Sequence, residues 1–166
     1  MKLKGRVIVG ALIALAVAVS CVFVSVVFQA RENAEVSACI GNQRQVSMGL
    51  KLYAEQHDGR YPPALAAVGP YVGNHVQLFS CPSAHAKVGR METVEQWADY
   101  TYVAGFGNAS PSDGVVLFCN PGNHPRGMVI VTFVDGHCDW MEQKELIHRL
   151  AARQNRSNQP SEATSQ

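Results

Sequence analysis

The sequence predicts an α+β fold in which a long N-terminal helix, partly membrane-spanning, packs on a small antiparallel β-sheet. Three observations support this fold class: an uncharged apolar run at residues 7–28, helical periodicity directly after it, and short β-rich runs after residue 99. The chain has 166 residues, which suits one modest domain with appendages.

The apolar run at residues 7–28 contains no charged residue and no Asn, Gln, Pro or His. As a helix, these 22 residues extend about 33 Å, enough to cross a hydrocarbon core of about 30 Å. The run is longer than the apolar part of a cleaved signal peptide, which favours an uncleaved anchor. Because Lys2, Lys4 and Arg6 precede it, the positive-inside rule predicts a cytoplasmic N-terminus and an external C-terminal domain.

The long helix is expected to continue out of the membrane to about residue 57, since no Pro interrupts it and apolar residues recur at helical spacing. Asp58-Gly59 and then Pro62-Pro63 predict its end. One face of this helix is expected to dock on the sheet. The residues of that face are Cys39, Asn42, Gln45 and Tyr53.

The later part of the chain predicts four strands and one helix. The strands are expected at residues 100–104, 114–118, 128–134 and 137–141, with a type I′ turn at Asp135-Gly136, and the helix at residues 142–153. Before them, residues 64–71 predict a helical turn broken at Gly69-Pro70, and residues 76–81 an extended segment.

These patterns divide the chain into a cytoplasmic N-terminus at 1–6, a transmembrane helix at 7–28, an extracytoplasmic domain at 29–153 and a disordered tail at 154–166. Fourteen Lys and Arg against thirteen Asp and Glu give a formal charge of +1. Without a basic field to attract phosphates, nucleic acid is not an expected partner.

Several short motifs occur in an order found in a known protein family. After the apolar run and Ala30-Arg31-Glu32 come residues 39–45 with Cys39, Asn42 and Gln45, then Tyr53, Asp58-Gly59, Pro62-Pro63, Phe79-Ser80-Cys81-Pro82, Tyr100 and Tyr102, His124, and Asp135-Gly136-His137. Over residues 30–140, this order resembles the type IV pilin-like and type II secretion pseudopilin-like proteins of planctomycetes and verrucomicrobia.

The resemblance implies a membrane-anchored structural or assembly component of a type II secretion or type IV pilus-like system. Its location would be the bacterial inner membrane, with the C-terminal domain in the periplasm. The implied partners are the lipid bilayer and other pilin-like subunits, contacted through the N-terminal helix, and the implied protein is not an enzyme. The alternative is a monomeric, membrane-tethered binding module for a metal or small ligand.

Two features depart from the family pattern. Pilin precursors usually present a Gly cleavage site followed by an apolar residue, with a Glu at the fifth mature position. Here Gly5 is followed by Arg6, and Gly10 occupies the position of the Glu, so we expect no ordinary prepilin processing. In addition, ten residues rather than nine separate His124 from Asp135.

The four cysteines outside the apolar run allow disulfides in an oxidising compartment. Cys119 and Cys138 flank the expected hairpin and are the preferred pair, with Cys39 and Cys81 as a second bridge. Free buried thiols are the alternative. Cys21 lies within the apolar run and is expected to behave as a small apolar residue.

Metal ligands are present in the later loops without a specific motif. A zinc site could draw on Cys81-x3-His85, Cys119-x4-His124 and His137-Cys138, and a calcium site on Asp113 and Asp135. Neither set has the spacing of a known metal motif, and the chain contains no GxSxG, HExxH or GxxxxGK[ST] sequence. The sequence therefore predicts no catalytic, cofactor or metal residues, and His124, Asp135 and His137 are expected to make polar bonds around the hairpin turn.

Overall fold

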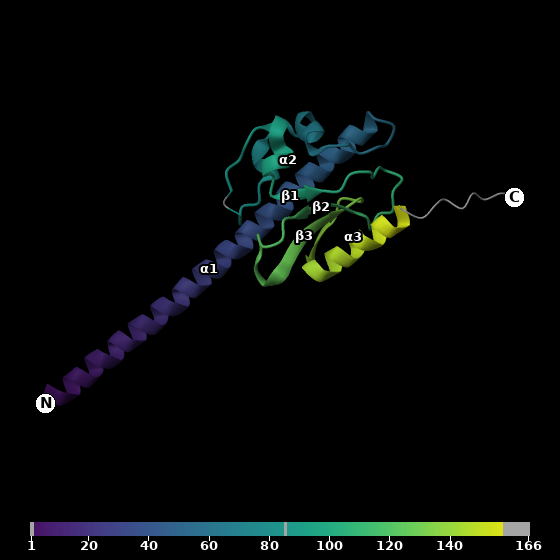
Figure 1. The fold of residues 1–166 in the computed structure, drawn as a ribbon. Coiled ribbons are helices and arrows are strands. Elements are labelled where there is room, and N and C mark those ends of the chain that lie inside the picture. The colour runs from purple at the N-terminus through teal and green to yellow at the C-terminus, as the bar shows by residue number, and fades with distance from the viewer. Residues whose placement is uncertain (1, 85, 158–166) are drawn as a thin grey trace. The chain divides into compact units, whose positions relative to one another are not determined.

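The computed structural model describes residues 2–84 and 86–157. These residues form two compact units that divide between Glu35 and Val36. Helix α1 (Lys2–Glu55) contributes to both units, and every other element belongs to the second. Figure 1 shows the order of these elements along the chain.

The first unit consists of the N-terminal part of α1. Within the described residues, this is the one helix long and apolar enough to cross a membrane. Its large apolar side chains between Leu12 and Phe28 are 50–69% exposed. The hydroxyls of Ser20 and Ser25 donate to backbone carbonyls one turn earlier, so neither needs a partner from outside the helix. The predicted helix over residues 7–28 is confirmed.

The second unit is built on a four-stranded antiparallel sheet in the order β1-β2-β3-β4. The strands are β1 (Tyr100–Tyr102), β2 (Val115–Cys119), β3 (Met128–Phe133) and β4 (Cys138–Glu142). All four lie where the β-branched and aromatic runs predicted them, within one or two residues. The α+β fold class is confirmed.

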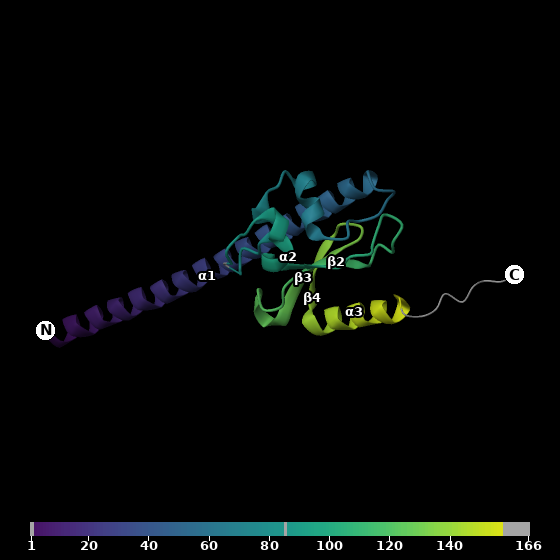
Figure 2. The same cartoon turned by 45° about the horizontal axis from the view of Figure 1, so that its top comes forward.

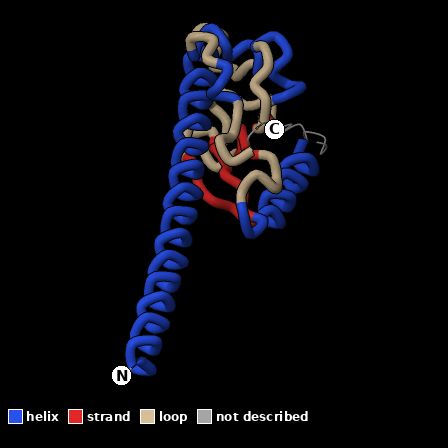
Figure 3. Tube along the Cα trace, turned by 90° about the vertical axis from the view of Figure 1, so that its left-hand side faces the viewer, coloured by secondary structure: helices blue, strands red, loops and turns tan. Residues whose placement is uncertain are grey.

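Helices cover both faces of this sheet (Figures 2 and 3). Side chains of β3 alternate, so that Ile130 packs in a core with the C-terminal part of α1, while Val129 and Val131 pack in a second core with α3 (Gln143–Ser157). Among the described side chains of α3, Leu146 is the buried one. The sheet is therefore the middle layer of three.

The docked face of α1 differs from the predicted one. Its buried residues are Cys39, Gln43, Val46, Ser47, Gly49, Leu50 and Ala54. Gln45 is exposed, and Asn42 and Tyr53 are half-buried, so the prediction of Gln45 on this face is wrong. At 100° per residue, Gln45 lies about 200° around the helix from Gln43 and cannot share its face.

Three local predictions also need correction. Residues 65–72 form one 3₁₀ helix (Leu65–Val72) that contains Pro70, whose fixed φ fits a helical backbone.

Residues 76–79 form a 3₁₀ helix (Val76–Phe79) instead of an extended segment, because local turn bonds from Leu78 and Ser80 satisfy the backbone and no strand is paired with it. Helix α3 continues to Ser157, so residues 154–157 are helical and the rest of the predicted tail lies outside the described residues. The remaining short helices are α2 (Val94–Trp97) and 3₁₀ helices at Met91–Thr93 and Pro125–Gly127.

The β3–β4 hairpin is confirmed, but its turn is not type I′. Gly136 has φ of 90°, whereas Asp135 is not among the residues with positive φ. The amide of Gly136 donates to the Phe133 carbonyl, and the amide of Phe133 donates to the His137 carbonyl. This is a three-residue loop closed by glycine, the usual alternative to the two-residue type I′ turn.

The end of α1 follows the predicted glycine signal. Asp58 and Gly59 have φ of 52° and 75°, and the Gly59 amide donates to the Ala54 carbonyl at 2.9 Å. This left-handed exit satisfies a carbonyl of the last helical turn. It also starts the path by which the chain returns along α1 before it enters the sheet.

Candidate functional site

Three cysteines and a histidine from four separate segments meet in the core of the second unit. Cys39 lies on the docked face of α1, Cys81 follows the 3₁₀ helix Val76–Phe79, Cys119 ends β2, and His124 precedes the 3₁₀ helix Pro125–Gly127. The three cysteines are fully buried and His124 is 4% exposed. We call these four residues the Cys3His cluster.

The ligand atoms of the Cys3His cluster all lie within 4.8 Å of one another. The Sγ atoms of Cys39 and Cys119 are 3.9 Å apart, and Cys81 Sγ lies 3.5 Å from His124 Nε2. The other ring nitrogen, Nδ1, has no hydrogen-bond partner within the described part of the chain. The ring of His124 lies edge-on to that of Trp140, with 5.5 Å between their centroids.

Polar hydrogens from the surrounding core point at the sulfurs. Gln43 Nε2 and Tyr100 Oη donate to Cys39 Sγ at 3.7 and 3.5 Å, and Asn123 Nδ2 donates to Cys119 Sγ at 3.5 Å. The loop carrying Cys81 is fixed by Asp99, whose Oδ2 accepts from the Cys81 amide at 2.9 Å and from the Ser80 hydroxyl at 3.0 Å.

The three thiols perturb one another strongly. Hydrogen bonds from the thiols of Cys119 and Cys39 hold the pKa of Cys81 far below its usual value. The reciprocal bonds to Cys39 and Cys81 raise the pKa of Cys119. For Cys39, the bond with Cys119 lowers the pKa, but the bond with Cys81 and burial outweigh it and raise the pKa to about 12.

The predicted motif residues divide between this cluster and other places. Cys39, Cys81 and His124 come together, and Pro82 directly follows Cys81. Asn42 donates to the Ser80 carbonyl at 3.1 Å and so supports the same loop from α1.

The other motif residues lie elsewhere in the unit. Tyr53 stacks on His57, Asp58 and Gly59 form the exit from α1, and exposed Gln45 bonds its own helix. Asp135 and Gly136 lie at the β3–β4 turn, where Lys51 of α1 donates to the Asp135 carbonyl.

His124 does not belong to the hairpin turn, contrary to the sequence-based expectation. The cluster meets α1 at Cys39 and the turn meets it at Lys51, twelve residues or about 18 Å further along the helix. Of His124, Asp135 and His137, the last two interact at the turn, where Asp135 Oδ1 accepts from the His137 amide at 3.0 Å. That backbone hydrogen bond holds the pKa of Asp135 below its usual value.

The structure does not bring Cys119 and Cys138 together. β3 lies between their two strands, and Cys138 Sγ contacts Thr132 Oγ1 at 3.2 Å. All five cysteines are free, including Cys39 and Cys81 of the second expected bridge. Of the residues considered for zinc, Cys81, Cys119 and His124 come together, His137 and Cys138 do not, and His85 lies outside the described residues.

The residue that sequence reasoning missed as a ligand is Cys39. It lies 42 residues before Cys81, and no other Cys or His lies within ten residues of it. Only the docking of α1 on the sheet places it beside the other three. The weak signal present was Cys119-x4-His124, two ligand types separated by a short loop.

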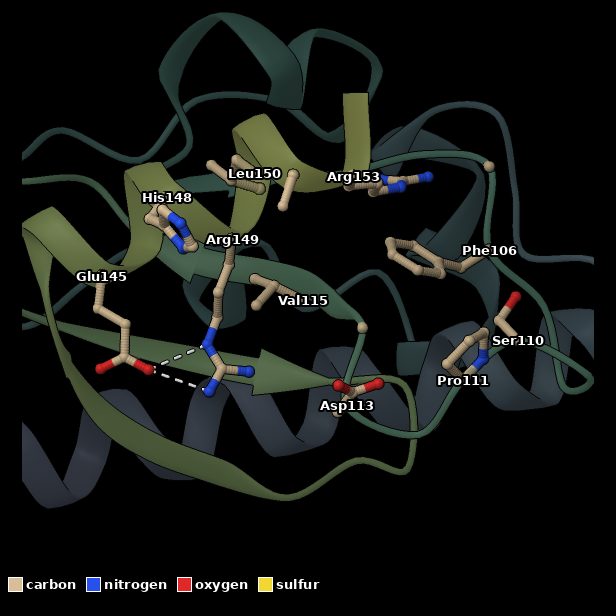
Figure 4. A pocket seen from close by; sticks show the side chains of 13 residues that line it. Phe106, Ser110, Pro111, Asp113, Val115, Glu145, His148, Arg149, Leu150 and Arg153 are labelled. Carbon is tan, nitrogen blue, oxygen red and sulfur yellow. Dashed lines mark hydrogen bonds and ion pairs between the residues drawn. The ribbon is translucent and has the colours of Figure 1, made fainter. Parts of the chain in front are cut away.

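A cavity of about 700 Å³ lies between α3 and the loop after β1 (Figure 4). Arg149 forms an ion pair with Glu145 at 3.0 Å. The guanidinium carbon of Arg153 lies 3.8 Å from the centroid of the Phe106 ring, and Arg153 also donates to the Ala104 carbonyl. Asp113, considered for calcium, also lines this cavity. Both arginines are thus engaged by the protein itself.

Comparisons of the chain with protein-family models, with curated proteins and with solved structures find no match in any of the three.

Proposed function

We propose that this chain is a single-pass membrane protein of the pilin-like class, anchored in a bacterial inner membrane by residues 7–28. The second unit lies in the periplasm and acts as a structural or assembly component of a type II secretion or type IV pilus-like system. The observation that carries this proposal is the exposed apolar surface of α1 within the first unit.

That surface needs an apolar environment. Eleven large apolar side chains between Leu12 and Phe28 are at least half exposed. Fully burying a Val, Leu or Phe side chain is favourable by roughly 1.5–3 kcal/mol. Since these eleven side chains are 50–69% exposed, moving their exposed surface from water to lipid gains on the order of 10–20 kcal/mol. An amphipathic surface helix is a poorer explanation, because the exposed apolar residues occur on every side of α1.

The pilin-like assignment rests on the continuity of one helix through two roles. The same α1 that carries the apolar surface supplies, from Cys39 to Ala54, the helix packed on an antiparallel sheet. This is the architecture that the motif order implies. Small residues at positions 10, 14, 16 and 18 allow close approach between neighbouring anchors in a bilayer.

With Gly10, the proposed assembly lacks the membrane-embedded carboxylate of ordinary pilin subunits. A buried carboxylate at that position would pair with the N-terminal amine of a neighbouring subunit, and such a pair is strong only in a low-dielectric environment. Without it, helix association depends on packing of small residues and on contacts outside the membrane. The N-terminus is therefore expected to keep residues 1–5.

Cross-linking in living cells tests the assembly role. A photoreactive amino acid at position 14 or 18 of the full chain is expected to capture pilin-like subunits or a second copy of this chain. The matched control replaces residues 7–28 with an unrelated spanning segment of equal length and carries the same photoreactive residue. Capture of lipid alone, or of the same proteins by the control, would contradict the proposal.

The alternative is a monomeric, membrane-tethered binding module, and the cavity beside α3 is the observation that favours it. Its volume suits a small organic ligand. A negatively charged ligand is less favoured, because Arg149 already pairs with Glu145 and Arg153 already donates to the Ala104 carbonyl. A small molecule retained by the purified full chain, and released by Phe106→Asp, would favour this alternative.

A further inference from the structure

We propose that Cys39, Cys81, Cys119 and His124 bind one zinc ion that joins α1 to the sheet and to the two loops beside it. Three thiolates and one imidazole are an established ligand set for structural zinc. All four residues are buried, so the site is closed and has no open coordination position for a substrate. The inference stands on the second unit alone and does not depend on membrane anchoring.

Two of the six distances between ligand atoms match a zinc tetrahedron, and the other four are at most 4.8 Å. With Zn–S bonds of about 2.3 Å and Zn–N bonds of about 2.0–2.1 Å, two ligand sulfurs lie about 3.8 Å apart and a sulfur and a nitrogen about 3.5 Å apart. The cluster has 3.9 Å between Cys39 and Cys119 and 3.5 Å between Cys81 and His124. A disulfide needs about 2.05 Å between its sulfurs.

The ligand count also favours a metal over oxidation. A disulfide between any two of the three cysteines leaves the third thiol buried beside it without a covalent partner. A zinc ion uses all three sulfurs together with His124 Nε2, the ring nitrogen that faces Cys81. Binding releases the thiol protons to the solvent, so that one Zn²⁺ and three thiolates leave a net charge of −1.

The protein around the cluster is suited to that charge. Gln43, Tyr100 and Asn123 each direct a polar hydrogen at a ligand sulfur. Hydrogen bonds of this kind orient metal ligands and stabilise thiolates. These three residues come from α1, β1 and the loop after β2, so the donors converge from different elements of the fold.

The primary test uses the wild-type full chain, purified in detergent on a histidine-free affinity tag without added chelator. We expect one zinc per chain by elemental analysis, and a zinc X-ray absorption spectrum with three sulfurs near 2.3 Å and one nitrogen near 2.0 Å. A zinc content equal to that of Cys119→Ser would overturn the proposal. So would an oxygen-only or nitrogen-only ligand shell, or a disulfide between two of the three cysteines in peptide mapping.

Variants identify the ligands. Cys119→Ser is expected to lose the zinc, whereas the matched control Cys138→Ser, a cysteine on β4 outside the cluster, is expected to retain it. Because Cys119→Ser can fail by unfolding, His124→Cys serves as a second variant: it offers four thiolates and should retain one zinc with four sulfurs. Retention of zinc by Cys119→Ser, or loss from Cys138→Ser, contradicts the assignment.

Discussion

Gln43 provides the sharpest test of how α1 docks on the sheet. This amide is completely buried, accepts from Thr132 Oγ1 at 2.8 Å and donates to the Ile130 carbonyl at 3.3 Å. It therefore bonds α1 directly to β3. Replacing it with Ala removes both bonds, together with the bond from Gln43 Nε2 to Cys39 Sγ, and leaves a cavity between the two elements.

The expected loss in the free energy of unfolding follows from the buried polar groups that lose their partner in Gln43. A buried polar group that loses its partner costs about 1–3 kcal/mol, and the cavity left by the missing side chain adds to this. We expect Gln43→Ala to lower the free energy of unfolding by about 2–4 kcal/mol. Gln43→Leu keeps most of the volume and should cost about 1–3 kcal/mol, because the Thr132 hydroxyl still loses its acceptor.

Gln45 is the matched control, since it is the same residue type two positions away and is exposed. Gln45→Ala should change stability by no more than about 0.5 kcal/mol. The assay is urea unfolding of the full chain in detergent, followed by the fluorescence of Trp97 and Trp140, both of which lie in the second unit. Equal midpoints for Gln43→Ala and Gln45→Ala would refute the docked face described above.

Three further predictions concern the core and the hairpin. Leu50→Ala, at a fully buried position, should cost about 2–5 kcal/mol in the same assay, whereas Leu52→Ala, at a position 42% exposed, should cost far less; similar losses would contradict the packing. Gly136→Ala should cost about 1–3 kcal/mol through strain at φ of 90°, and an unchanged midpoint would mean that the turn has another shape. Because the His137 amide lowers the pKa of Asp135 from 3.8, its stabilisation is present above about pH 3.8 and is lost as the pH falls through the folded-state pKa. The stability difference between wild type and Asp135→Asn should therefore shrink below pH 3.8. A difference that grows on acidification would contradict a lowered pKa of Asp135.

Residue patterns sufficed for the elements whose stability is local. The β-branched run before Asp135-Gly136 predicts β3 and its hairpin, and Asp58-Gly59 predicts the end of α1. The turn type was wrong because Asp-Gly is compatible with both two-residue and three-residue loops. The choice between them depends on strand pairing, which places Phe133 opposite His137.

The docked face and the cluster could not be predicted because both depend on tertiary contacts. Gln43 is polar and would be assigned to the exposed side of a helix, yet β3 supplies partners for its amide. Cys39 gains its neighbours only after α1 packs on the sheet, since 80 residues separate it from Cys119. Residue spacing in the sequence does not predict such a long-range contact.

The most direct test of membrane anchoring is the side of the membrane on which the second unit lies. A recognition site for a specific protease is inserted after residue 157 of the full chain, and that protease is added to intact spheroplasts. We expect cleavage without detergent, and retention of the remaining chain in the membrane fraction after alkaline extraction. Cleavage only after the membrane is opened with detergent, or release of the uncleaved chain by alkali, would contradict a single-pass anchor with an external C-terminal unit.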